Sequence, residues 1–117
     1  MSDEKLTQKK CQPCEGGTSP LSREDAQKLL NEAEGWQLNK DATMLYREET
    51  LKNFVACVEY IRLIAGVAEE EQHHPDLHLT GYKHLRIELN THAIGGLSEN
   101  DFIMAAKINE IPIATES

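Results

Sequence analysis

The longest regular pattern in the chain is helical, and a proline limits where it can end. Apolar residues recur at helical spacing from about Leu51 to Glu71. Pro75 cannot lie inside a helix and biases the residue before it toward extended geometry, so the helix must end by about His73. The stripe expected to face the core contains Leu51, Phe54, Val58, Ile61, Ala65 and Ala68. Further apolar residues widen this surface, which predicts burial against both a sheet and a second subunit.

Shorter patterns before and after this helix predict two pairs of strands and two more helices. Ser22 and Asp25 have the form of a capping box, and apolar residues then recur at helical spacing to Ala33. Ser98 and Asp101 begin a last helix in the same way. The predicted strands cover residues 36–38, 43–50, 76–80 and 83–92. The order α-β-β-α-β-β-α predicts an α+β fold, in which an antiparallel four-stranded sheet carries three helices on one face.

Residues 1–20 differ in composition from the rest of the chain. They are polar, contain the turn-forming stretch EGGTSP, and show no apolar period. We expect a flexible N-terminal arm or a loosely docked loop here, followed by one domain over residues 21–117. A chain of 117 residues can bury about 65% of its unfolded surface, which is enough for a core without disulfides.

Charge and cysteine content argue against several classes of protein. A net charge of −8 and a pI near 5.0 weigh against nucleic-acid binding, which needs clustered Lys and Arg. The longest apolar segment falls well short of the roughly 20 residues that span a bilayer, so we expect no membrane segment. The chain has three cysteines, an odd number, and a charged N-terminus without a signal-peptide pattern. These features predict a reduced, cytoplasmic protein.

Histidine is the only chemically reactive residue type that clusters in the sequence. Metal binding is the first function to consider for such a cluster. If the segment after Pro75 is extended, His74 and His78 lie roughly 13 Å apart, too far for one zinc ion. Cys11 and Cys14 supply only half of a zinc site. Two thiols without a metal-binding role are therefore the preferred interpretation. Cys57, in the middle of the long helix, is expected to be a small buried hydrophobe. We therefore predict no metal site.

Proton transfer is the chemistry that remains, because the chain has no nucleophile elbow, P-loop or dinucleotide fingerprint. Imidazole titrates near pH 6.5 and is the natural proton-transfer group at neutral pH. Glu69 lies one helical turn before His73, so its carboxylate is expected to orient that ring. His73, His74 and His92 each have an ordinary explanation, as helix-end cation, surface cap or solvated strand end, but together they predict one cleft. Asp101 is explained by capping alone.

The remaining histidines and acidic residues near this cluster are interpreted as solvated surface. This group contains His78, His84 and the run of three glutamates at positions 69–71, apart from the orienting role given to Glu69.

The spacing of these residues resembles the signature of a known family. Glu69, the HHP of residues 73–75, Tyr82, His92 and Asp101 stand at the intervals found in the pterin-4a-carbinolamine dehydratase family. The segment LNTHAIGGLSENDF also resembles that family, and the predicted element order fits its fold. The chain departs from the pattern at Tyr82, which lies in a Gly-containing turn, and in the longer gap after the proline. Neither departure touches the three histidines.

The resemblance implies an activity and a set of site residues. The implied enzyme removes water across N5 and C4a of 4a-hydroxytetrahydropterin, left by aromatic amino acid hydroxylases, and gives quinonoid dihydropterin in tetrahydropterin recycling. It implies general acid/base catalysis by His73, His74 and His92, with Glu69 polarising His73 and no cofactor. Which histidine is acid and which is base stays open. The implied pterin-binding residues are Gln72, His73, His74, Asn90, Thr91, His92 and Ala93.

The resemblance also implies a homodimer or homotetramer and a functional link to an aromatic amino acid hydroxylase. A second hypothesis, from a different class, is a non-catalytic dimeric pterin-binding or protein-interaction module on the same fold. Such a module would keep its binding after loss of the three histidines.

Overall fold

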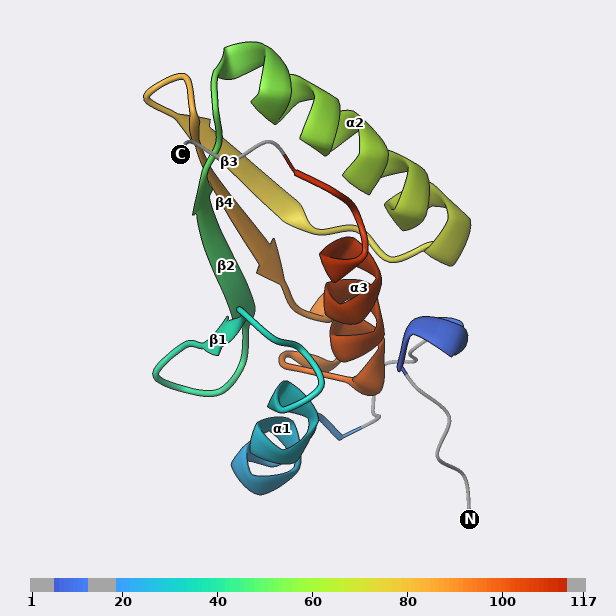
Figure 1. Cartoon of the computed structure of the whole chain (residues 1–117). Coiled ribbons are helices and arrows are strands. Elements are labelled where there is room, and N and C mark those ends of the chain that lie inside the picture. Colours follow the sequence, from blue (N-terminus) through green and yellow to red (C-terminus); the bar gives the residue numbers. More distant parts are fainter. Residues whose placement is uncertain (1–5, 13–18, 114–117) are drawn as a thin grey trace.

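The computed structural model describes residues 6–12 and 19–113, and its centre is a four-stranded antiparallel sheet with the strand order β1-β2-β4-β3 (Figure 1). The strands are β1 (Gln37–Leu38), β2 (Leu45–Thr50), β3 (Asp76–Thr80) and β4 (His84–Leu89). The helices are α1 (Arg23–Leu30), α2 (Phe54–Glu71) and α3 (Glu99–Asn109), and the short 3-10 turns are η1 (Leu6–Gln8) and η2 (His92–Ile94). The predicted α+β class and the order α-β-β-α-β-β-α are confirmed.

The helices are not equivalent in their packing. Figure 1 shows α2 and α3 against one face of the sheet, with α1 beside the lower end of α3. Within the described residues, no helix is both long enough and apolar enough to cross a membrane.

Capping residues define where the helices begin. The Ser22 hydroxyl accepts a hydrogen bond from the backbone N–H of Asp25 at the start of α1, as the sequence predicts. Helix α2 begins later than predicted, because the Asn53 side chain caps it by accepting from the N–H of Ala56. Leu51 therefore lies before the helix, where it is fully buried.

The buried face of α2 differs from the predicted stripe. From the predicted stripe, Ala68 is buried and Ile61 packs against the core, whereas Phe54 and Val58 are 52% and 47% exposed, and Val55 beside them is 73% exposed. The other buried apolar residues of the helix are Cys57, Tyr60 and Ile64. Before Ala68, the buried positions are offset by about one residue, or 100° around the helix, from the predicted ones, and both sets are apolar. Packing against the sheet selects the face, so apolar periodicity alone could not choose it. The predicted burial of Cys57 is confirmed.

Strand β4 supplies the inner face of the sheet. Its side chains alternate as predicted, with Leu85, Ile87 and Leu89 buried and the residues between them more exposed. On the opposite face, the Arg86 guanidinium lies 4.2 Å from the ring centroid of Tyr46. One face of the sheet therefore packs on the helices and the other is polar.

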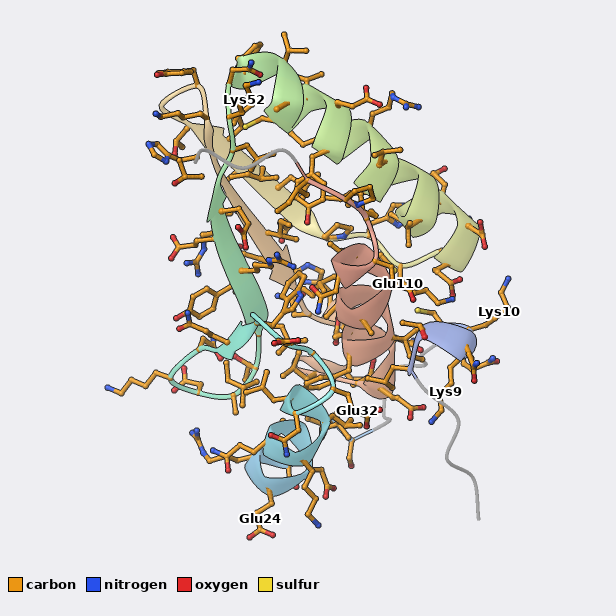
Figure 2. The ribbon with its side chains drawn as sticks, in the orientation of Figure 1. Lys9, Lys10, Glu24, Glu32, Lys52 and Glu110 are labelled. Carbon is orange, nitrogen blue, oxygen red and sulfur yellow. The ribbon has the colours of Figure 1, made fainter. Side chains whose placement is uncertain are left out.

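Part of the predicted arm packs against the domain. Leu6 is 3% exposed and belongs to the hydrophobic core, and η1 packs against α3. Lys9 and Lys10 follow η1 (Figure 2), and Lys9 is partly buried whereas Lys10 is exposed. The boundary at residue 21 stays a prediction, and Cys14 lies outside the described residues. Residues 6–12 are nevertheless packed against the domain, and are not a flexible arm.

The assignment of the buried face predicts unequal costs for truncating α2. Ile64→Ala should lower the free energy of unfolding by about 2–5 kcal/mol, because it leaves a cavity in the core. Val58→Ala, on the exposed face, should change it by less than about 0.5 kcal/mol in dilute protein. Urea unfolding followed by circular dichroism measures both values. Equal losses for the two variants would contradict the assigned face.

Candidate active site

A cavity of about 560 Å³ lies where the end of α2 and the start of α3 approach the end of β4. Its lining residues are Lys10, Cys11, Gln12, Glu70, Glu71, Gln72, His73, His74, Asn90, Thr91, His92, Ala93 and Asn100. The structure thus brings all seven residues of the predicted pterin-binding set to one cavity. Glu69 is not among the lining residues, but it contacts one of them.

Local backbone geometry places the histidines at this cavity. Gln72 ends α2 in the left-handed conformation, with φ of 55°, and Pro75 follows in the extended segment that leads into β3. After β4, an isolated bridge between Thr91 and Gly96 closes a short loop that contains η2. His92 is the first residue of η2 and is held at the mouth of this loop. One histidine therefore follows a strand, and two follow a helix.

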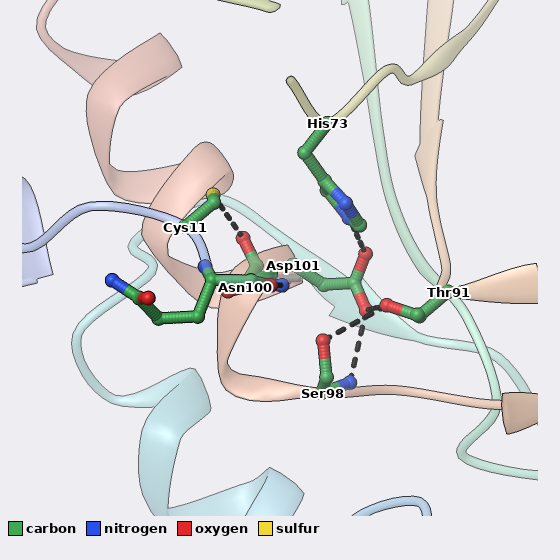
Figure 3. Close-up of polar contacts among 7 residues, drawn as sticks. Cys11, His73, Thr91, Ser98, Asn100 and Asp101 are labelled. Atoms are coloured by element: carbon green, nitrogen blue, oxygen red, sulfur yellow. Dashed lines mark hydrogen bonds and ion pairs between the residues drawn. The ribbon is translucent and has the colours of Figure 1, made fainter. Parts of the chain in front are cut away.

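His73 is held by a buried carboxyl group. Its Nε2 lies 2.7 Å from Oδ1 of Asp101, and the Asp101 side chain is fully buried. The other carboxyl oxygen, Oδ2, accepts hydrogen bonds from the Thr91 hydroxyl at 2.8 Å and from the Ser98 backbone N–H at 3.0 Å (Figure 3). Capping was the only role expected for Asp101. It does cap α3, and it also holds His73.

The partner predicted for Glu69 is wrong. Its carboxylate lies 2.6 Å from Nε2 of His74, not beside His73. The prediction assumed that the helix continued through His73, whereas the left-handed Gln72 rotates the following residues off the helical path. The His74 and Glu69 side chains are 57% and 73% exposed, so this pair is far more solvated than the His73–Asp101 pair.

His92 differs from the other two histidines. It is exposed and lines the cavity, and within residues 6–12 and 19–113 its ring has no carboxyl partner. His78 and His84, interpreted as surface from the sequence, are indeed exposed and lie on the strands. His78 contacts Glu88 at 3.1 Å, away from the cavity. The cavity therefore collects three of the five histidines.

Glu71 was expected on the surface and is instead buried, with 1% of its side chain exposed. Its Oε2 accepts from Lys107 Nζ at 2.6 Å, and its Oε1 accepts from the Cys11 backbone N–H at 2.9 Å. Burial raises the pKa of Glu71, but these hydrogen bonds and the charge of Lys107 outweigh it and hold the pKa below its ordinary value. Glu71 lies three residues after Ala68 on the buried face of α2, so a helical projection gives its position on that face. It does not give the partner, Lys107, which is distant in sequence.

Cys11 is a cavity residue that sequence reasoning left without a role. Its Sγ lies 3.6 Å from the backbone oxygen of Asn100. Burial, and then the nearby charge of Glu71, raise the pKa of the thiol to about 12. The thiol therefore stays protonated at neutral pH and does not have the character of a nucleophile.

The arrangement suits proton transfer to and from a molecule in the cavity. Two imidazoles each hold one ring nitrogen against a carboxyl group, which fixes the ring orientation. A third imidazole stands at the same cavity. Such a site can donate one proton and accept another on a single bound ring.

Comparison with known proteins places this geometry in a family. Residues 19–111 match the family described as Pterin 4 alpha carbinolamine dehydratase. A protein of Nitrosomonas europaea, provisionally named as a pterin-4-alpha-carbinolamine dehydratase, is 50% identical over 105 residues, covering 89% of this chain and 90% of the relative.

Two further comparisons extend the match. Pterin-4-alpha-carbinolamine dehydratase 2 of Arabidopsis thaliana is 45% identical over 111 residues, covering 92% of this chain and 59% of the plant protein. The crystal structure of a transcriptional coactivator/pterin dehydratase from Brucella melitensis superposes with a TM-score of 0.71 at 27% identity, covering 78% of this chain and 96% of that one.

The Glu71–Lys107 pair predicts a pH-dependent contribution to stability. Because the folded pKa of Glu71 lies below its ordinary value of 4.5, the contribution is fully present above about pH 4.5 and is lost as the pH falls through the folded pKa. Glu71→Gln should therefore lower the free energy of unfolding by about 1–3 kcal/mol at pH 7, and by less at pH 3. Denaturant unfolding at the two pH values measures this difference.

Glu70→Gln is the matched control, because Glu70 is the exposed neighbour of Glu71. It should change the free energy of unfolding by less than about 0.5 kcal/mol at either pH. A Glu71→Gln loss of the same size at pH 3 and pH 7 would contradict an ionised, stabilising carboxylate.

Proposed function

This chain belongs to the pterin-4-alpha-carbinolamine dehydratase family, and from that premise we propose that it converts 4a-hydroxytetrahydropterin into quinonoid dihydropterin and water. The observation that carries the proposal is the gathering of His73, His74 and His92 at one cavity. Two of the three are also backed by carboxyl groups. The proposal requires no metal ion and no cofactor.

The reaction needs two proton movements on one substrate. The bond between C4a and the hydroxyl oxygen breaks, and a general acid protonates the departing oxygen so that it leaves as water. A general base removes the proton from N5, and the electron pair of that N–H bond forms the N5=C4a double bond. One imidazolium and one neutral imidazole next to the ring can supply both steps.

His73 is proposed as the best-organised of these groups. A carboxyl group that accepts from Nε2 of His73 keeps the proton of the neutral ring on that nitrogen and leaves the lone pair on Nδ1. It also stabilises the positive charge that appears on the ring when Nδ1 takes a proton. The His74–Glu69 pair has the same connectivity in a more solvated setting, so its contribution should be smaller.

Oligomer formation, location and pathway belong to the same proposal. The exposed apolar side chains Phe54, Val55 and Val58 on α2 support a homodimer or homotetramer. The unpaired thiols Cys11 and Cys57 are consistent with a reducing cytoplasm. We propose a link to an aromatic amino acid hydroxylase, because the substrate would be that enzyme's product and the product would return to the tetrahydropterin pool.

The direct test follows the decay of freshly generated 4a-hydroxytetrahydropterin by ultraviolet absorbance. Wild type should accelerate the decay over buffer, and His73→Ala and His92→Ala should each lower kcat by roughly 10²–10⁴-fold, because each removes a proton-transfer group.

His78→Ala is the matched control, since it removes an exposed histidine that does not line the cavity, and its rate should match wild type. Acceleration that survives both the His73→Ala and the His92→Ala changes would contradict histidine catalysis. If wild type binds a pterin but does not accelerate the decay, the protein is a binding module on the dehydratase fold.

A further inference from the structure

One side of the cavity comes from a part of the chain that the proposed mechanism does not use. Lys10, Cys11 and Gln12 line the cavity together with the three histidines. They follow η1, which packs against α3. The arm therefore contributes to the site even though it precedes the segment that matches the family.

The backbone of this segment is held by two buried polar side chains. The Gln12 N–H donates to Oδ1 of Asn100 at 2.9 Å, and Nδ2 of Asn100 donates to the Gln12 carbonyl oxygen. The Asn100 amide thus pairs with one residue of the arm as a neighbouring strand would. The Cys11 N–H donates to Glu71. Asn100 and Glu71 are only 7% and 5% exposed, so release of the arm would take hydrogen-bond partners from both.

A hydrophobic anchor holds the other end of the segment. The Leu6 side chain is 3% exposed and lies in the hydrophobic core, outside the lining of the cavity. Between this anchor and the cavity, Lys9 Nζ lies 2.8 Å from Glu99 on the first turn of α3. The segment is therefore fixed before its cavity-lining residues by Leu6 and Lys9, and at Cys11 and Gln12 by their backbone hydrogen bonds.

The residues that anchor the arm lie next to His73 and to the Asp101 carboxyl group that holds it. Glu71 precedes His73 by two residues, and Asn100 directly precedes Asp101. The same two helix ends thus position the His73–Asp101 contact and the arm. Figure 3 shows Cys11 beside Asn100, and His73 beside the Asp101 carboxyl group. The arm residues that line the cavity therefore lie where the two helix ends meet.

We propose that Lys10–Gln12 form a wall of the pterin-binding site, and that Leu6, Asn100 and Glu71 are positioning residues that hold this wall. The inference rests on the proposed function. The wall covers part of the bound pterin and excludes water from it, while the histidines perform the proton transfers. Contacts of this kind act equally on the bound substrate and on the transition state, so their loss raises KM and leaves kcat nearly unchanged.

Steady-state dehydration kinetics on the full chain test this directly. Leu6→Ala and Asn100→Ala should each raise KM at least about fivefold and change kcat by less than about twofold, because both release the arm from different points. Leu85→Ala is the matched control. It removes the same side chain as Leu6→Ala from the same core, but from the start of β4, away from the cavity, and its KM should match wild type.

Protection of the Cys11 thiol provides a second readout that a purely structural role would not affect. In a Cys14→Ser background, maleimide labelling of the folded protein at pH 9 reports on Cys11, because Cys57 is fully buried. The raised pKa of Cys11 leaves a small thiolate fraction at this pH, so the labelling is slow but measurable. Saturating 7,8-dihydrobiopterin should slow this labelling at least about fivefold, since the bound pterin covers the wall. Leu6→Ala should speed the labelling in the absence of pterin.

The outcomes separate this inference from the proposed function. A wild type that neither dehydrates the carbinolamine nor binds dihydrobiopterin in equilibrium dialysis overturns both. A wild type that is active, with unchanged KM in both arm variants and no protection of Cys11, overturns the wall alone. A fall in kcat at unchanged KM would likewise overturn it.

Discussion

The architecture of the site depends on one buried carboxyl group. Asp101 is fully buried and accepts hydrogen bonds from three separate parts of the chain, namely His73 after α2, Thr91 after β4, and the backbone of Ser98 before α3. A buried carboxyl group is costly unless its oxygens are satisfied, and here each partner comes from a different element. Satisfying it therefore requires that the helix end, the strand end and the loop meet, which is the geometry that forms the cavity.

A second buried carboxyl group, that of Glu71, connects the arm to the two helices in the same way. Glu71 receives Lys107 of α3 and the backbone of Cys11, so α2, α3 and the N-terminal segment are held together close to the His73–Asp101 contact. The two carboxyl groups have different consequences. One orients a ring that can exchange protons, and the other fixes a wall of the cavity. In this account, the Asp101 contact serves proton transfer and the Glu71 contacts serve substrate binding. The two sets of contacts are neighbours, but each can be altered separately.

Much of the fold and part of the site could be predicted from the sequence, for physical reasons that differ by residue. The order of elements followed from periodicity and capping, which are local, and the cavity-lining histidines followed from a spaced signature. Pairings across the fold were not local. The Glu69 contact was assigned to His73 on the assumption that the helix continues through Gln72. Gln72 is left-handed instead, and a glutamine gives no indication of this in the sequence, because residues other than glycine seldom adopt that conformation. The burial of Glu71 depends on Lys107, which is distant in sequence, and apolar periodicity could not choose between two adjacent faces of α2.

The most direct test of this account is a double-mutant cycle between His73 and Asp101 in kcat/KM, using His73→Ala, Asp101→Asn and the double variant. If the carboxyl group acts through the imidazole that it holds, Asp101→Asn should be strongly impaired alone but should add less than about twofold to the loss already caused by His73→Ala. Fully multiplicative losses in the double variant, with all three proteins folded, would show that Asp101 acts independently of His73 and would contradict the central claim.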